Sequence, residues 1–211
     1  MAYDLEEQEQ IDAIKGWWSD YGKLVMLGVI AVLVGISGVQ GWRYYRAQQA
    51  ERAATLYSQV VEAERANEAK RVRDIAAQIV DKYGSSQYAG MAALAAAKAG
   101  VATGEIDDAK KNLQWAVDHA KEDELRDVAR LRLAGVLLDE KKYDDALKLL
   151  SVKAGDAFAV LYADMRGDVL VGQGKPAEAR AAYQVALEKS DPASAYRRLV
   201  EVKLDALGDT K

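Results

Sequence analysis

An uncharged apolar stretch near the N-terminus limits the possible folds more than any other feature. No charged residue occurs between Leu24 and Trp42. As a helix rising about 1.5 Å per residue, this stretch is roughly 28 Å long, enough to cross the hydrocarbon core of a membrane. A cleaved signal peptide fits poorly, because the residues before the stretch are acidic rather than basic. We therefore predict a transmembrane helix over residues 23–43, preceded by a segment 1–22 and followed by a domain 44–211.

Aromatic residues mark both ends of the predicted span. Their rings favour the two membrane–water boundaries. They are Trp17, Trp18 and Tyr21 before it, and Trp42, Tyr44 and Tyr45 after it. The basic residues near the span are Lys15 and Lys23 before it, and Arg43, Arg46 and Arg52 after it. This small excess weakly favours a cytoplasmic location for the large domain.

Composition restricts the class of the remaining chain. The formal net charge is −4, so no basic surface for nucleic acid is indicated. The absence of cysteine excludes disulfides, thiol catalysis and cysteine-based metal sites. Only two prolines occur and alanine is frequent, which favours helix almost throughout.

Three segments of the domain share one pattern, with matching alanines 37 and 33 residues apart, close to the ~34-residue period of a tetratricopeptide repeat. A small residue precedes each alanine by twelve positions, and a larger residue follows it by four. The three sets are Ala97, Ala109 and Leu113; Ala134, Ala146 and Leu150; and Gly167, Ala179 and Tyr183. Small residues let two antiparallel helices approach closely, and the larger residue fills the adjoining groove. The pattern predicts stacked helical hairpins.

Segments on either side of the repeats are also predicted to be helical. Residues 43–67 place Leu56, Val60 and Ala63 on one face of a helix that follows the span. Residues 191–207 form a predicted terminal helix with Asp191 as its N-cap and Pro192 at its first position. The expected fold is all-α: one N-terminal transmembrane helix, then a tetratricopeptide-like α-hairpin solenoid with a C-terminal capping helix.

Residues for catalysis are scarce. His119 is the only histidine, and its position suggests a solvated helix end. The turn GQGK at 172–175 lacks the preceding strand and the spacing of a phosphate-binding loop. Pairs of carboxylates such as Asp107 and Asp108 fall at helix starts, where they favour the helix dipole. We expect no enzyme activity, no cofactor and no metal.

Several segments resemble the YfgM family, whose members are ancillary subunits of the bacterial SecYEG translocon. The resemblance extends over nearly the whole chain. It is strongest in EEQEQIDAIKGWWSDYGK (6–23), GWRYYRAQQ (41–49), IVDKYGSSQYAGMAALAAAK (79–98) and DMRGDVLVGQGKPAEARAAY (164–183).

The resemblance implies a single-span protein of the bacterial inner membrane, with a cytoplasmic segment 1–22 and a periplasmic repeat domain. This orientation opposes the weak charge preference, and we adopt it because that preference rests on one basic residue. The implied partners are SecYEG, a membrane-anchored chaperone resembling PpiD, and secreted client proteins. The implied function is that of a scaffold or co-chaperone that helps to hand over secreted proteins. The alternative is a generic membrane-tethered adaptor for envelope complex assembly or stress-response regulation.

Two candidate contact surfaces follow from the repeats and the span. In a hairpin solenoid the first helix of each repeat lines the concave face. Aligning the repeats places ten residues there: Met91, Leu94, Val101, Val128, Leu131, Leu138, Leu161, Asp164, Asp168 and Val171. We expect this strip to accept a segment of a partner protein, although several of its side chains could instead be interior contacts. In the span, Gly35, Gly38 and Gly41 could let another transmembrane helix approach.

Overall fold

A computed structural model of the chain describes the backbone of residues 2–208 and the side chains of residues 10–208. Within this part the structure is helical and contains no strand, as predicted. The elements are α1 (Ala2–Arg65), α2 (Ala69–Tyr83), α3 (Gln87–Thr103), α4 (Ile106–His119), α5 (Asp123–Asp139), α6 (Tyr143–Leu149), η1 (Asp156–Phe158), α7 (Ala159–Gly172), α8 (Pro176–Lys189) and α9 (Ala195–Ala206). The side chains of residues 1–9, within the predicted segment 1–22, and residues 209–211 lie outside the described residues.

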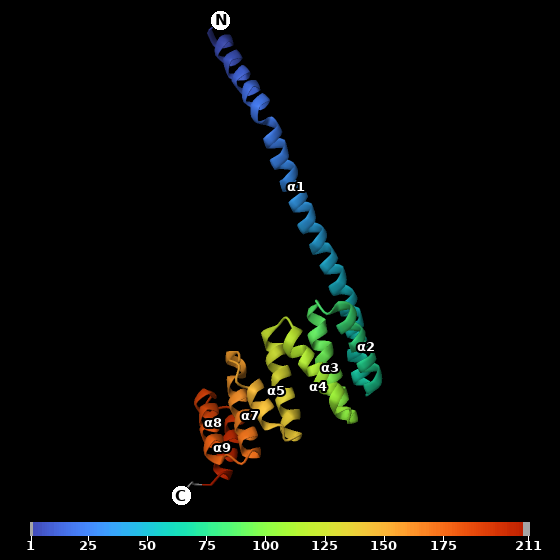
Figure 1. Cartoon of the computed structure of the whole chain (residues 1–211), viewed down its shortest axis with the longest axis vertical. Helices are drawn as coiled ribbons and strands as arrows, with labels where there is room; N and C mark the ends of the chain where they lie inside the picture. Colours follow the sequence, from blue (N-terminus) through green and yellow to red (C-terminus); the bar gives the residue numbers. More distant parts are fainter. Residues whose placement is uncertain (1, 209–211) are drawn as a thin grey trace. The chain divides into compact units, whose positions relative to one another are not determined.

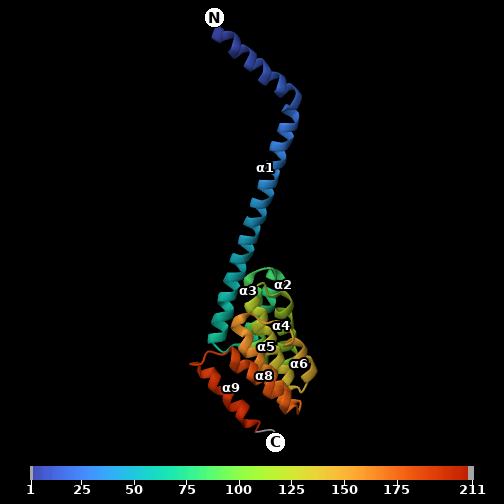
Figure 2. The same ribbon diagram turned by 90° about the vertical axis from the view of Figure 1, so that its left-hand side faces the viewer.

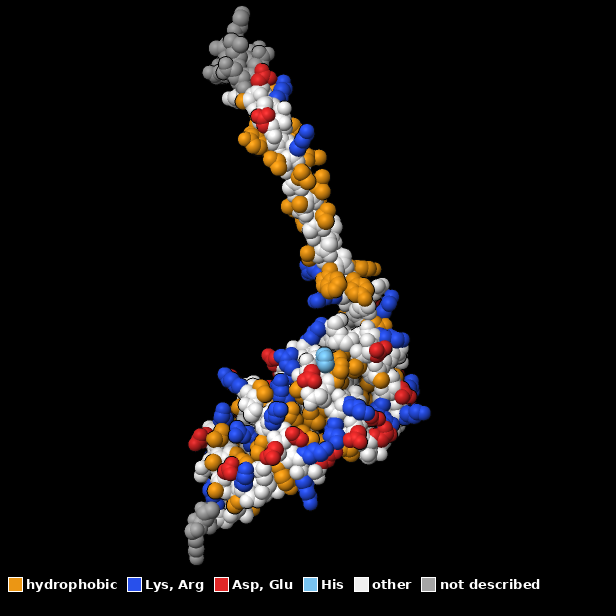
Figure 3. All heavy atoms as spheres, in the orientation of Figure 1, with side chains coloured by type: hydrophobic (Ala, Val, Ile, Leu, Met, Phe, Trp, Pro, Cys, Tyr) orange, Lys and Arg blue, Asp and Glu red, His pale blue; other side chains and the backbone are white. Residues whose placement is uncertain are grey.

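The chain divides into two compact units, Met1–Gln48 and Gln49–Lys211. The first unit is a single stretch of helix, and the apolar side chains along it are exposed, as the orange spheres in Figure 3 show. Its most apolar window has a mean hydropathy of 2.2, and none of that window is buried. A helix that exposes so much apolar surface has the length and composition of a membrane span.

The second unit is a row of helical hairpins. From α2 onward each helix packs against the next along the chain, so that α3–α4, α5–α6 and α7–α8 form three consecutive hairpins and α9 packs on α8 (Figures 1 and 2). The first helices of the hairpins also touch one another, α3 with α5 and α5 with α7. The end of α1 and α2 precede the first hairpin and share its core, with Val60 and Ala63 fully buried on the predicted face of α1.

The residues that define the repeat pattern all lie in the interior. The three alanines Ala109, Ala146 and Ala179 have no exposed surface. Their large neighbours Leu113, Leu150 and Tyr183 are at most 2% exposed. A Cβ atom at Gly167 would overlap the ring of Tyr183, so the third hairpin closes only because position 167 has no side chain. The steric basis predicted for the repeat is confirmed.

The start of the last helix differs from the prediction. The helix α9 begins at Ala195, and its N-cap is Ser194, whose side-chain oxygen accepts the backbone N–H of Tyr196 at 3.1 Å. Asp191 instead accepts the backbone N–H of Ala193 at 2.8 Å. The prediction of Asp191 as the N-cap was therefore wrong, because its carboxylate stabilises a local turn that delays the helix.

Candidate partner-binding site

The inner face of the solenoid is formed by the first helices α3, α5 and α7, since these touch one another while a groove separates α4 from α6. Eight of the ten residues predicted for this face are wholly or partly buried. Leu94 is only 7% exposed and belongs to the core between the first and second hairpins. Leu131 and Leu138 pack against the core shared by α5, α6 and α7. These side chains make interior contacts.

Three further residues of the predicted strip are half-buried. Val128 packs against the same core as Leu94, and Met91 and Leu161 lie on α3 and α7. The exposed members of the strip are Val101, which is 47% exposed, and Val171, which is 43% exposed. The binding of a partner by the strip as a whole remains a prediction, and these two valines are its accessible apolar positions.

Val101 lies in a hollow of about 330 Å³ between α3 and α5. The floor contains Ala97, Val136 and Leu113, and thus two residues of the repeat pattern. Its remaining lining residues are Lys98, Arg132, Gly135 and Asp139. The hollow offers an apolar depression with charged groups at its edge, which suits an apolar side chain carried by a polar segment. Val101 was predicted from the sequence but the charged rim was not, because the rim combines residues from two helices.

Asp164 and Asp168 on α7 form hydrogen bonds and ion pairs with the last helix. Lys203 of α9 donates to both carboxylates, at 2.9 Å from Asp164 and 2.8 Å from Asp168. The hydroxyl of Tyr196 donates to Asp164 at 2.5 Å, and that of Tyr183 donates to Asp168 at 2.8 Å. Burial, and then the bond to an aspartate, raises the pKa of both phenols. This cluster fastens α9 to the third hairpin.

Lys203 remains charged in this cluster. Burial alone would lower its pKa, but hydrogen bonds to the two aspartates outweigh that effect and raise it. Asp164 is only 4% exposed, so the cation compensates a carboxylate that water hardly reaches. A partner that used either carboxylate would have to displace Lys203.

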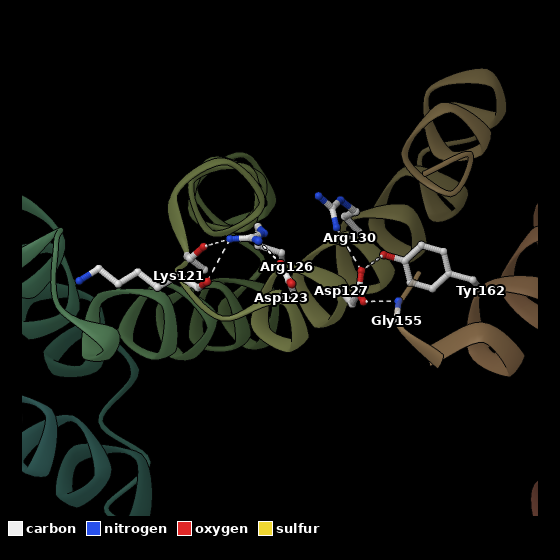
Figure 4. A network of polar contacts seen from close by, with 8 residues as sticks. Lys121, Asp123, Arg126, Asp127, Arg130, Gly155 and Tyr162 are labelled. Carbon is white, nitrogen blue, oxygen red and sulfur yellow. Dashed lines mark hydrogen bonds and ion pairs between the residues drawn. The ribbon is translucent and has the colours of Figure 1, made fainter. Parts of the chain in front are cut away.

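A second buried carboxylate, Asp127 on α5, joins the second hairpin to the third (Figure 4). One of its oxygens accepts the backbone N–H of Gly155 at 2.9 Å. The other accepts the hydroxyl of Tyr162 at 2.8 Å and pairs with Arg130 at 3.1 Å. Burial, and then the bond to Asp127, raises the pKa of Tyr162 to about 12. These contacts hold the loop after α6 in an extended conformation.

The helix α6 is short. It has 7 residues, whereas α4 and α8 have 14 each. Gly155, held by Asp127, has extended backbone angles of φ −58° and ψ 153°, which a helix cannot accommodate. A groove of about 700 Å³ lies between α4 and α6, with Leu133 and Leu137 of α5 among its lining residues. The groove was not predicted from the sequence, because its lining combines residues of α4, α5 and α6.

The glycines of the predicted span have no neighbours in the first unit. A Cβ atom at Gly35, Gly38 or Gly41 would meet nothing within 4 Å. Each position is exposed, so a helix could approach there without a steric conflict. The proposed contact with another transmembrane helix remains a prediction.

His119 ends α4, as the sequence indicated. Its ring is exposed, stacks on Trp115 at 5.0 Å between ring centroids, and lies 3.0 Å from the carbonyl oxygen of Trp115. No group of three His, Asp or Glu side chains suited to hold a metal ion occurs among the residues that the structure describes.

Comparisons with known proteins identify the family. The family model described as a tetratricopeptide repeat-like domain matches residues 15–209. A protein of Neisseria gonorrhoeae is 33% identical over 98% of this chain and all of its own length. Relatives from Escherichia coli and Haemophilus influenzae are 31% and 28% identical, over 95% and 98% of this chain and 96% and 100% of their own lengths. All three are named ancillary SecYEG translocon subunit. The chain thus belongs to the YfgM family of tetratricopeptide repeat-like ancillary translocon subunits.

Proposed function

We propose that this protein is a single-span adaptor of the bacterial inner membrane that associates with the SecYEG translocon. The observation that supports this most strongly is the match to translocon subunits over 98% of the chain, from the apolar helix to the last hairpin. A helix with the composition of a membrane span supplies the anchor. A helical repeat domain, which typically offers extended surfaces for partners, supplies the contacts.

The adaptor is oriented with residues 1–22 in the cytoplasm, residues 23–43 in the membrane and residues 44–211 in the periplasm. In this orientation the repeats stand where secreted chains leave the translocon. The positive-inside rule opposes it only weakly, since two basic residues precede the span closely and three follow it. A chaperone resembling PpiD and the secreted chains are the further partners of the repeat domain, which aids the hand-over of those chains.

The hollow around Val101 is the contact point of this function. It is accessible, its floor is apolar, and Lys98, Arg132 and Asp139 provide charged groups at its edge. A leucine-sized side chain fits such a depression, and flanking polar groups of the partner can pair with the rim.

The experiment compares two exposed valines. Val101→Asp places a carboxylate in the hollow. Val185→Asp places one on the surface of α8, away from the hollow, where the valine is 40% exposed. We expect Val101→Asp to lower co-purification of the translocon or the chaperone with the full chain about tenfold, and Val185→Asp to leave it unchanged.

Far-UV circular dichroism verifies that both variants are folded. If a folded Val101→Asp variant retains its partners, the hollow is not the contact point. If the unsubstituted chain, extracted from its own membranes in mild detergent, brings no SecYEG with it, the adaptor function itself is wrong.

A further inference from the structure

The last helix has an apolar face that the repeat domain leaves uncovered. One side of α9 is turned inward, where Val200 is fully buried and Tyr196, Leu204 and Leu207 pack against the core of the third hairpin. On another side, Leu199 is 49% exposed and Val202 is 65% exposed. Ala195 and Ala206, the two ends of the helix, are exposed as well. Figure 2 shows α9 as an outermost helix of its unit.

The exposed apolar residues follow the spacing of a coiled-coil seam. Ala195, Leu199, Val202 and Ala206 are separated by four, three and four positions. This alternation of four and three positions keeps one narrow stripe of side chains facing a second helix. The seam residues are small at the two ends of the helix and larger in its centre, which allows close packing of a short helix pair.

Two charged residues beside the seam decide which helix fits. Arg198 and Asp205 are seven positions apart and lie along the same edge of the seam. Both are exposed, and among residues 10–208 neither forms an ion pair with another side chain. On the opposite edge, Tyr196 and Lys203 are held by the aspartates of α7. The free edge thus presents one positive and one negative group.

We propose that the α9 helices of two copies of this chain pair in antiparallel orientation along this seam. In that register Leu199 packs against Val202 of the second copy, and Ala195 against Ala206. Arg198 then faces Asp205 of the second copy, and two-fold symmetry forms the same ion pair twice. A parallel pair would instead bring Arg198 beside Lys203 of the second copy, whose charge is already engaged by Asp164 and Asp168, and would form neither of these ion pairs. The charge pattern therefore favours the antiparallel pair.

The contact is small and correspondingly weak. A pair of 12-residue helices buries less than the ~1,200 Å² typical of stable interfaces. Two copies anchored in one membrane meet at a much higher effective concentration than in dilute solution, so a weak contact is sufficient there. The pairing concerns α9 only and is independent of the hollow around Val101.

The first test uses disulfide formation in native membranes. The chain contains no cysteine, so introduced thiols are the only ones it carries. Two differently tagged full-length copies are co-expressed, one with Ala195→Cys and the other with Ala206→Cys, and oxidised with copper phenanthroline. In the antiparallel pair these positions face each other, whereas two copies of position 195 are about 16 Å apart, too far for a disulfide.

We expect the mixed disulfide to form at least fivefold faster than either homodimeric one. A predominance of the 195–195 and 206–206 products would show a parallel pair and overturn the proposal. Formation of no dimer, or of disulfides mainly with another protein, would overturn it as well.

The second test exchanges the charges. Arg198→Asp and Asp205→Arg each replace two ion pairs by two like-charged pairs, and each should lower the rate of the mixed disulfide about tenfold. The double variant Arg198→Asp/Asp205→Arg restores the attraction and should restore the rate. Lys153→Asp, an exposed residue outside α9, is the control for a general effect of charge. If the double variant is as slow as the single ones, the ion pairs do not form and the antiparallel register is wrong.

Discussion

Removal of the Asp127 carboxylate should loosen the junction between the second and third hairpins. The side chain is 3% exposed and accepts hydrogen bonds from the Gly155 amide and the Tyr162 hydroxyl, in addition to its ion pair with Arg130. Asp127→Ala leaves all three donors without this acceptor. The Arg130 side chain is only 17% exposed, so water replaces the carboxylate poorly.

The expected loss follows from these contacts. Breaking a buried ion pair by removing one partner costs about 3–5 kcal/mol. Asp127→Asn keeps one acceptor but no charge, so its loss should be smaller, about 2 kcal/mol. Tyr162→Phe removes a single hydrogen bond and should cost about 1 kcal/mol. The ranking of the three variants by their loss of unfolding free energy is a sharper test than any one value.

Urea unfolding of the full chain in detergent micelles, followed by far-UV circular dichroism, measures the three losses. Hydrogen exchange locates them, because the Gly155 amide should exchange about 100-fold faster in Asp127→Ala if at least 3 kcal/mol is lost there. A loss below about 1 kcal/mol for Asp127→Ala, or unchanged exchange at Gly155, would refute the view that Asp127 holds this junction.

Three other predictions concern the second unit. Gly167→Ala should destabilise the domain by about 1–3 kcal/mol because the new methyl group overlaps the Tyr183 ring, and Tyr183→Leu should recover part of this loss in urea unfolding. Stability should fall as the pH rises from about 10 toward 12, because the fold favours the neutral Tyr162 phenol while the unfolded chain ionises it near pH 10, and Tyr162→Phe should lessen this fall. Lys203→Met should leave the buried Asp164 unpaired and speed hydrogen exchange throughout α9, whereas unchanged exchange would show that other contacts hold the helix.

The architecture was predictable because its signals are local and periodic. The uncharged run from Leu24 to Trp42 indicated the span, and three matching alanines indicated the hairpins. The same alanines are fully buried, since only small side chains allow the paired helices to approach. The buried helix face with Val60 and Ala63 was also predictable, because its apolar residues follow the 3.6-residue period of a helix.

The accessible part of the candidate surface was not predictable to the same degree. Leu131 lies at a repeat position that lines the concave face in principle, but contacts from α6 and α7 partly cover it. The pairing of Asp164 with Lys203 spans 39 residues and has no local signature. The hydrogen bond from Gly155 to Asp127 likewise spans 28 residues. A single sequence shows such long-range contacts only after the fold places them together.

The most direct test of the adaptor function determines on which side of the membrane the repeat domain lies. Protease is added to intact spheroplasts and, for comparison, to lysed ones, and fragments of residues 50–211 are detected by antibody. We predict that the domain is degraded in intact spheroplasts, as a periplasmic domain should be, while a cytoplasmic marker protein survives. Protection of the domain until lysis would place it in the cytoplasm and contradict a role in receiving secreted chains.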